Sequence, residues 1–276
     1  MSQGSDQELL VRALEVVRLD PDSESELRWE LVNALRSRAS TEVFDAVAGW
    51  CEDADAVVRE LGADVLGQLG MPDADGRWPF GDRSVVLLRR MLADPEPAVL
   101  QSVIVALGHQ LAADTDEQAC DPEWFRGHAE HADPEVREAV AWALRLRCDA
   151  AGGAQEILIR LMRDEAQPVR NWATFGVAQS DAHSDAVTEA LFTRLGDADE
   201  EVRAEALIGL ARRKDPRVLA LVEKALSADE VSGAVVEAAA ELGRPSLLPR
   251  LRELALAHPD DEAIAEALVR CGGVLQ

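Results

Sequence analysis

Residues 53–67 read Asp-Ala-Asp-Ala-Val-Val-Arg-Glu-Leu-Gly-Ala-Asp-Val-Leu-Gly, and variants of this stretch recur along the chain. Each copy begins with an aspartate, continues with a Val-Arg pair and ends in small and apolar residues at helical spacing. The complete copies are Asp53 with Val58-Arg59, Asp133 with Val136-Arg137, Asp164 with Val169-Arg170, and Asp197 with Val202-Arg203. A further copy, Asp94 with Val99-Leu100, lacks only the arginine.

The valines of these copies set a period. They stand at positions 58, 99, 136, 169 and 202, so successive steps are 41, 37, 33 and 33 residues long. Periods in this range are typical of stacked helical hairpins, each with a first helix, a tight turn and a second helix. Prolines near the expected helix starts, at 95, 134, 168 and 216, agree with this division. We therefore predict an all-α fold, a right-handed α-solenoid of about seven to eight antiparallel hairpins.

Counting from the repeat valine indicates which face of each second helix is buried. Offsets 0, 4, 7, 8 and 11 share one helical face, and in the first copy they carry Val58, Gly62, Val65, Leu66 and Leu69. Small residues at offset 7 would let neighbouring second helices approach closely. We expect the turn aspartate to accept hydrogen bonds from the first amides of the second helix, and the arginine to reach an aspartate of an adjacent repeat. Both are interpreted as structural.

The motif Asp-x-x-x-x-Val-Arg followed by small residues and Leu-Gly resembles the short HEAT-like repeats of the phycobilisome-lyase type, over roughly residues 20–243. We predict a single solenoid over residues 1–276, with irregular capping hairpins at about 1–40 and 244–276. Insertion loops are expected at about 71–83 and 112–122. For function, the family implies scaffolds, bilin lyase or chaperone subunits and, in one branch, alkylpurine DNA glycosylases.

Composition narrows the partners. The chain has 28 Lys and Arg against 52 Asp and Glu, a formal charge of -24, which repels nucleic acids and anionic membranes. A basic or neutral protein partner fits better, although the charge is equally explained as solubilising. The four scattered cysteines form no Cys-x-x-Cys pair and read as reduced thiols. No export signal or membrane span is recognised, which favours a cytoplasmic, bacterial-type protein.

The face opposite the predicted core carries an apolar row. Offsets 2, 6 and 9 point away from the stacking side, and second helices normally line the concave groove of such a solenoid, so these positions should be polar. Offset 6 nevertheless reads Asp64, Val105, Trp142, Phe175 and Ile208. We predict a partner-binding floor with a carboxylate rim, made by Trp142, Trp172, Phe175, Ile208, Glu138, Glu205 and Asp64. The alternative is that tight curling buries these side chains, or that the phase is wrong by one residue.

A search for chemistry returns little. No phosphate-binding loop or nucleophile motif is present, so no catalytic residue, metal ligand or cofactor is assigned. His128, Glu130 and His131 form a weak metal-like cluster that histidines capping a helix end explain as well. HEAT-like di-iron enzymes use repeated His-Glu dipeptides, and this chain has none. A glycosylase needs a basic groove, whereas the chain has one strong basic cluster, Arg212-Arg213-Lys214.

Three classes of function remain. The leading one is a non-catalytic scaffold or adaptor that binds a basic or amphipathic protein or peptide in its groove. The second is an acidic inhibitor or immunity-type protein that neutralises a basic nucleic-acid-binding protein. The third is a lyase- or chaperone-like subunit that holds an apolar prosthetic group. In the insertion at 71–83, Trp78 and Phe80 are expected to tuck back over a neighbouring hairpin rather than contact a partner.

Overall fold

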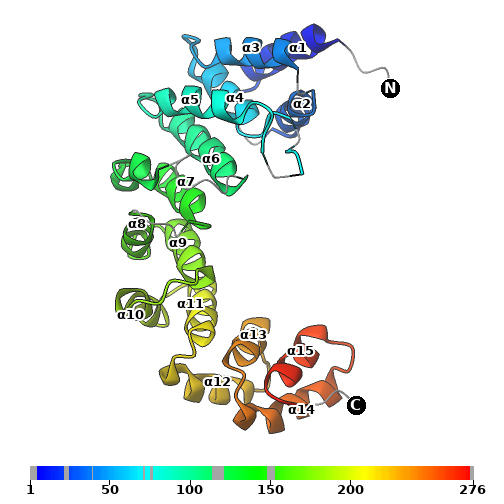
Figure 1. Ribbon diagram of the computed structural model, residues 1–276, viewed down its shortest axis with the longest axis vertical. Coiled ribbons are helices and arrows are strands. Elements are labelled where there is room, and N and C mark those ends of the chain that lie inside the picture. Colours follow the sequence, from blue (N-terminus) through cyan, green and yellow to red (C-terminus); the bar gives the residue numbers. More distant parts are fainter. Residues whose placement is uncertain are drawn as a thin grey trace. The chain divides into compact units, whose positions relative to one another are not determined.

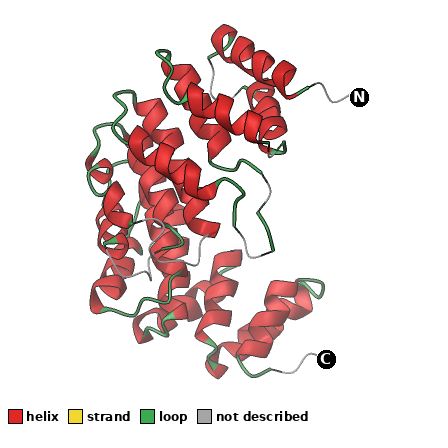
Figure 2. Ribbon diagram, turned by 45° about the horizontal axis from the view of Figure 1, so that its top comes forward, coloured by secondary structure: helices red, strands yellow, loops and turns green. Residues whose placement is uncertain are grey.

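The structure is a computed structural model that describes residues 5–21, 25–38, 40–70, 72–74, 77–113, 121–147 and 153–273. Every regular element within these ranges is a helix (Figure 2), so the all-α prediction is confirmed. The helices cluster into two compact units, each of which is described by itself. Continuity as one solenoid over 1–276 stays a prediction. The second insertion loop, at about 112–122, lies largely outside the described residues.

The first unit holds the helices up to α7 (Figure 1). They are α1 (Asp6–Leu19), α2 (Glu26–Arg36), α3 (Thr41–Trp50), α4 (Ala56–Leu66), α5 (Gly81–Met91), α6 (Pro97–Ala113), the short 3-10 turns η1 (Pro122–Phe125) and η2 (His128–Glu130), and α7 (Pro134–Leu144). Sequence-adjacent helices pair into hairpins, and the second helices α2, α4, α6 and α7 pack on one another in that order.

The second unit holds Arg145 and the remaining helices. They are α8 (Ala154–Leu161), α9 (Gln167–Gln179), α10 (Asp185–Arg194), α11 (Glu200–Arg212), η3 (Pro216–Val218), α12 (Leu219–Leu226), α13 (Gly233–Leu242), η4 (Pro245–Leu247), α14 (Leu248–Ala257) and α15 (Glu262–Arg270). Here α9, α11, α13 and α15 are the second helices and pack in that order. Figure 1 shows the first helices α8 and α10 on the same side of α9 and α11.

Small residues bring neighbouring second helices into backbone contact. In four helix pairs the residue at offset 7 of one helix meets offset 9 of the preceding repeat: a Cβ added at Gly209 would lie 2.7 Å from the Cβ of Ala178. The same pairing joins Gly67 to Ala106, Gly108 to Ala143 and Gly176 to Arg145. The prediction that small residues at offset 7 permit close approach is therefore confirmed. The core face is confirmed as well, because Val58, Gly62, Val65, Leu66 and Leu69 are all buried.

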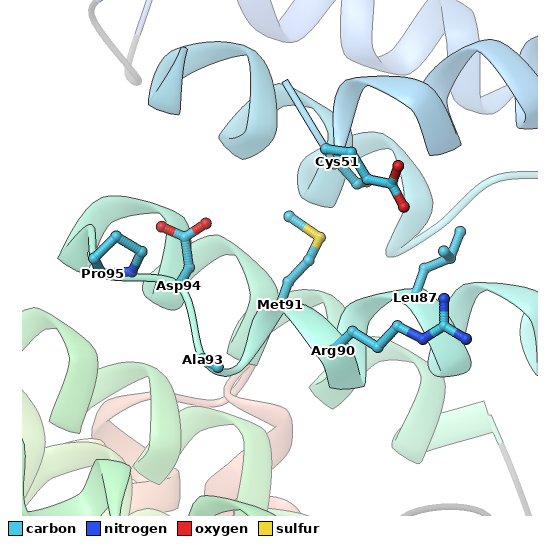
Figure 3. A pocket seen from close by; sticks show the side chains of 8 residues that line it. Cys51, Leu87, Arg90, Met91, Ala93, Asp94 and Pro95 are labelled. Carbon is cyan, nitrogen blue, oxygen red and sulfur yellow. The ribbon is translucent and has the colours of Figure 1, made fainter. Parts of the chain in front are cut away.

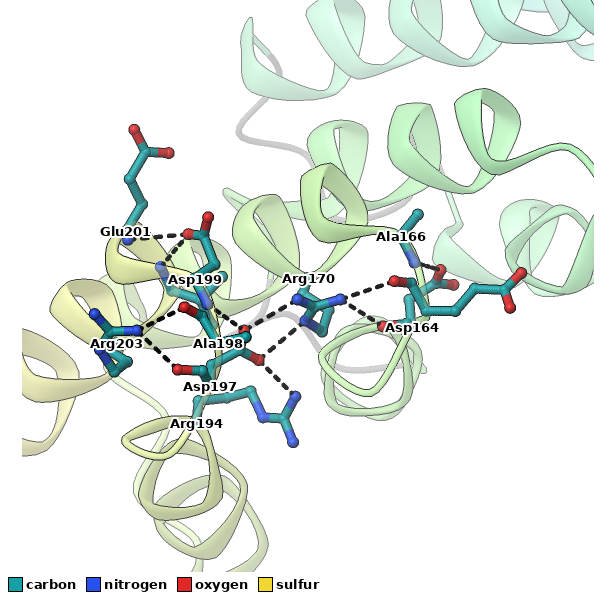
Figure 4. Close-up of polar contacts among 11 residues, drawn as sticks. Asp164, Ala166, Arg170, Arg194, Asp197, Ala198, Asp199, Glu201 and Arg203 are labelled. Atoms are coloured by element: carbon teal, nitrogen blue, oxygen red, sulfur yellow. Dashed lines mark hydrogen bonds and ion pairs between the residues drawn. The ribbon is translucent and has the colours of Figure 1, made fainter.

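The repeat aspartates and arginines form a ladder along the turns (Figure 4). Arg59 donates two hydrogen bonds to Asp94 of the next repeat, 2.7 and 3.0 Å long, and Arg170 donates two of 3.0 Å to Asp197. Each of these arginines also donates to two carbonyl oxygens of its own turn. The predicted bridge to the adjacent repeat is confirmed in both places.

The prediction that the turn aspartate accepts a first amide of the second helix is confirmed at Asp133, which accepts the Glu135 amide of α7 over 2.9 Å, but two other copies differ. Asp53 and Asp197 accept the backbone amide two residues on, which closes the turn, whereas a second aspartate is the N-cap. Asp55 caps α4, and Asp199 caps α11 through the amides of Glu201 and Val202. The Asp-x-Asp spacing thus assigns one carboxylate to the turn and one to the helix start.

Replacing Asp197 with asparagine should lower the free energy of unfolding at neutral pH by about 1–3 kcal/mol, since two charge-assisted hydrogen bonds from Arg170 lose their acceptor charge. Burial alone raises the pKa of Asp197, but hydrogen bonds from Arg170 and the Asp199 amide, with the charges of Arg170 and Arg194, bring that pKa below its ordinary value. A carboxyl with a depressed folded-state pKa contributes its full stability above its unfolded pKa of about 3.9 and loses it progressively as pH falls from there through the lower folded-state pKa.

Urea titrations at pH 7 and near pH 3 check this expectation. The deficit of Asp197→Asn relative to the parent chain should be smaller at the lower pH, because the parent has then lost part of the same interaction. Asp199→Asn is the matched control and should change stability little, since asparagine caps helices as well as aspartate does. An equal deficit at both pH values would contradict a charge-dependent ladder.

The first insertion packs against the molecule rather than projecting from it. The ring of Phe80 stacks on Phe44 with centroids 5.0 Å apart, and Trp78 is half-buried. The expected tucking of these rings is confirmed for the described part of the insertion. No helix in the described part of the chain combines the length and apolar character needed to cross a membrane.

Candidate interaction surface

Two aromatic side chains on α9 remain partly exposed on the face of the second helices in the second unit. Trp172 and Phe175 are half-buried, and their rings meet edge to face with centroids 6.0 Å apart. The guanidinium of Arg145 lies 5.8 Å from the Trp172 ring centroid, on the flank of α9 where Gly176 contacts the Arg145 backbone. The guanidinium of Arg145 therefore already covers one side of the aromatic pair.

The opposite flank of the pair, toward α11, is acidic. Near the start of both helices, the Nδ2 atom of Asn171 donates to Glu201 over 2.8 Å, and near their ends Arg212 donates to Gln179 over 2.6 Å. These two contacts fix the register between α9 and α11. This register places Glu205, between Glu201 and Arg212 on α11, at the level of Phe175. We call the surface made by Trp172, Phe175 and Glu205 the α9–α11 surface.

Glu205 is a carboxylate in an unfavourable position. It is half-buried, and its Oε2 atom is shielded from solvent and accepts no hydrogen bond from the described residues. Burial raises the pKa of Glu205, Glu237 raises it further, Arg212 lowers it in part, and Glu201 adds a smaller increase. The side chain thus keeps a negative charge at neutral pH only against desolvation and like-charge repulsion.

The other predicted site residues fall into the first unit or into the core. Trp142 and Glu138 lie on α7 of the first unit and are half-buried, and the Trp142 ring meets His109 edge to face at 4.8 Å. The structure therefore assembles only part of the predicted set, Trp172, Phe175 and Glu205, into one surface within a unit. The partner-binding role of all these residues stays a prediction.

Two residues predicted to be exposed are not, and that part of the prediction is wrong. Asp64 is 8% exposed because Arg28, reaching across from α2, binds its carboxylate. Ile208 is 5% exposed because α11 is packed between α9 and α13 and an isoleucine extends less far from its helix than an aromatic ring. Neither offers a side chain to a partner. Counting offsets from the repeat valine assigns each residue to a face of its helix. It does not show which neighbouring helix covers that face.

A pocket of about 300 Å³ opens in the first unit at the turns of two hairpins (Figure 3). Leu87, Met91 and Pro95 supply apolar wall, and Cys51 lies buried within it. Burial, with the nearby charge of Glu52, raises the pKa of Cys51 to about 12 despite a backbone hydrogen bond that lowers it. The thiol is therefore protonated at neutral pH and is a poor nucleophile. The carboxylate of Asp94, which also lines the pocket, forms a salt bridge with Arg59.

The histidine cluster around residue 130 makes backbone contacts. The Nε2 atom of His128 lies 2.9 Å from the Leu92 carbonyl oxygen, and the Nδ1 atom of His131 accepts the Asp133 amide over 3.1 Å. The imidazoles hold η2 against neighbouring turns, in keeping with a structural role.

With this geometry in view, comparison with known proteins establishes the class. The family model described as HEAT repeats matches residues 84–178 and 188–270, together more than half of the chain. The chain belongs to the HEAT-repeat family, which confirms the resemblance seen in its sequence. In sequence it is similar to Protein YibA of Escherichia coli strain K12, 29% identical over 254 residues that span 92% of this chain and 89% of YibA.

Solved structures agree. An X-ray structure of Escherichia coli YibA is 28% identical, covers 97% of this chain and 92% of its own, and superposes with a TM-score of 0.75. A crystal structure of an engineered protein, 20% identical with a TM-score of 0.60, covers 98% of this chain and 81% of its own and supports the fold alone. These relatives define an architecture of stacked helical hairpins, a fold that commonly mediates protein interactions.

Proposed function

We propose that this protein is a non-catalytic scaffold or adaptor whose α9–α11 surface binds a basic or amphipathic segment of another protein. The observation that carries the proposal is the half-buried Trp172–Phe175 pair on α9, together with the Glu205 carboxylate on the neighbouring α11, whose Oε2 atom accepts no hydrogen bond from the described residues. Aromatic side chains anchored on rigid helices lose little entropy on binding and are frequent hot spots of interfaces. Nearby carboxylates select a cationic partner over an anionic one.

Net charge supports the same choice of partner. A chain of formal charge -24 repels other polyanions at long range and raises the association rate of basic proteins, an effect that added salt screens. The anchors supply affinity and the charge supplies selectivity. This division of roles makes a specific prediction for single substitutions at the surface.

Replacing Phe175 with alanine is expected to weaken partner binding at least tenfold, as for an interface hot spot. The same change should cost the fold well under the roughly 3–5 kcal/mol typical of a fully buried phenylalanine, because the ring is only half-buried. Phe192→Ala is the matched control, since Phe192 lies on the first helix α10 and is 37% exposed. It should leave binding unchanged.

Tagged parent chain, Phe175→Ala and Phe192→Ala would each be used to purify partners from cells of the source organism, with quantitative mass spectrometry. Urea unfolding of each purified variant separates lost binding from lost folding. Equal recovery of the same partners by the parent and by Phe175→Ala would rule out the α9–α11 surface as the binding site.

A further inference from the structure

In two places among the described residues, this chain holds one of its own arginines between an aromatic ring and a carboxylate. The guanidinium of Arg217 lies 4.2 Å from the Phe192 ring centroid while donating to Glu189 over 2.7 Å. That of Arg83 lies 3.9 Å from the Phe44 centroid while donating to Asp45 over 2.9 Å. A flat guanidinium suits both partners, since it stacks on the ring and donates hydrogen bonds from its edge.

On the α9–α11 surface, Phe175 and Glu205 supply the same two components, and the arginine nearest the aromatic pair, Arg145, lies against Trp172 instead. Phe175 provides a ring and Glu205 a carboxylate at the same level, and among the described residues no guanidinium lies over that ring or donates to that carboxylate. In the two internal examples an arginine completes the arrangement. At Phe175 and Glu205 none of the described arginines has this role.

Neighbouring cations do not fill this role, because each is held elsewhere. Arg212 donates to Gln179 and lies 3.8 Å from Glu241, and Arg145 lies on the opposite flank against Trp172. Glu201 and Glu237 add negative charge around Glu205, so the local field favours an incoming cation. An arginine from outside would donate a hydrogen bond to a carboxylate whose Oε2 atom has none from the described residues and whose charge Arg212 offsets only in part.

We propose that Phe175 and Glu205 bind an arginine side chain of the partner, stacked on the ring and hydrogen-bonded to the carboxylate. The inference rests on the proposed function, because it names the group recognised at the same surface. It predicts a preference for arginine over lysine, since the ammonium of lysine is compact, more strongly hydrated and cannot stack. It also predicts that binding requires the positive charge of the guanidinium.

The test uses three capped decapeptides in which alanine alternates with arginine, lysine or citrulline. Titration calorimetry at about 150 mM salt limits unspecific attraction to the acidic chain. The arginine peptide should bind the parent most tightly, the lysine peptide about five- to tenfold more weakly, and the citrulline peptide not measurably, as expected for a cation–π contact combined with a charged hydrogen bond.

Variants locate the binding. Glu205→Gln and Phe175→Ala should each reduce arginine-peptide affinity about tenfold, whereas Glu230→Gln, which removes the same charge from an exposed turn, should reduce it less than about twofold. The unfolding midpoint of Glu205→Gln should equal or exceed that of the parent, because a desolvated charge is removed.

Equal affinity for the arginine and lysine peptides, or an effect of Glu205→Gln no larger than that of Glu230→Gln, overturns the inference. The proposed function is judged separately by capture of cellular partners. If Phe175→Ala abolishes capture and Glu205→Gln leaves it intact, arginine recognition fails and the docking surface stands. If Phe175→Ala leaves capture intact, the docking surface itself fails.

Discussion

Replacing Arg28 with alanine is expected to destabilise the N-terminal hairpins by about 3–5 kcal/mol. Arg28 on α2 is fully buried, and its Nη2 atom donates to Glu60 and Asp64 on α4, each over 2.8 Å. Both carboxylates are almost as buried as the arginine. Without Arg28, two desolvated negative charges face each other in a site that excludes water.

The pKa of the Glu60 carboxyl shows that its charge is unfavourable in this site even with Arg28 present. Burial raises the pKa of Glu60 above its ordinary value, Arg28 lowers it in part, and the charge of Asp64 raises it again. In addition, the Nε and Nη1 atoms of Arg28 have no hydrogen-bond partner among the described residues. The ion triad is therefore a poor source of net stability and a severe penalty when broken.

Urea unfolding and hydrogen exchange of α1 and α2 check the Arg28 prediction. Arg18→Ala is the matched control: its side chain is 52% exposed and lies 3.7 Å from Asp53, so its loss should cost at most about 1 kcal/mol. The triple variant Arg28→Met, Glu60→Leu, Asp64→Leu should recover most of the lost stability, because no buried charge remains. A deficit for Arg28→Ala no larger than that for Arg18→Ala would show that the triad is not buried as described.

Replacing Gly209 with alanine is expected to destabilise the second unit by about 1–3 kcal/mol through overpacking. The new methyl carbon would lie 2.7 Å from the Cβ and 2.8 Å from the Cα of Ala178, so α9 and α11 must move apart. Alanine is otherwise the better helix former by about 1 kcal/mol. The sign of the effect therefore decides whether helix contact or helix propensity dominates at this position.

Gly49→Ala, in α3, gives the opposite expectation. A Cβ there has no atom within 4 Å, so the substitution should stabilise the chain by up to about 1 kcal/mol. Thermal and urea unfolding of both variants provide the measurement. A stabilising Gly209→Ala would mean that second helices are not in backbone contact, and the packing account of the hairpin stack would fail.

Much of the fold can be predicted from the sequence, because each repeat carries the residues that pack against the next repeat. The period of the Val-Arg motif, the small residues at offset 7 and the bridge from Arg170 to the next turn all depend on features that each repeat supplies to the following one. Asp64 and Ile208 were assigned wrongly for the complementary reason. Their burial depends on what lies across from them, Arg28 of α2 in one case and α13 in the other, and position within a single helix does not encode that.

The sequence predicts the aromatic residues of the candidate site, but it does not predict which side chains lie next to them. Trp172 and Phe175 stand out in the sequence because aromatics are rare and these two share one helical face. The placement of Phe175 and Glu205 at the same level depends on the register between α9 and α11, which contacts such as that between Asn171 and Glu201 establish. The occupied flank of Trp172 was missed because Arg145 belongs to no motif.

The most direct test of the central claim is site-specific photo-crosslinking in cells of the source organism. A benzophenone-bearing phenylalanine analogue placed at position 175 or at position 192 reports what lies against each surface. The account predicts a discrete covalent adduct with a basic partner protein from position 175 and none from position 192. Adducts from position 192 with none from position 175 would place the interface on the first helices and contradict the claim.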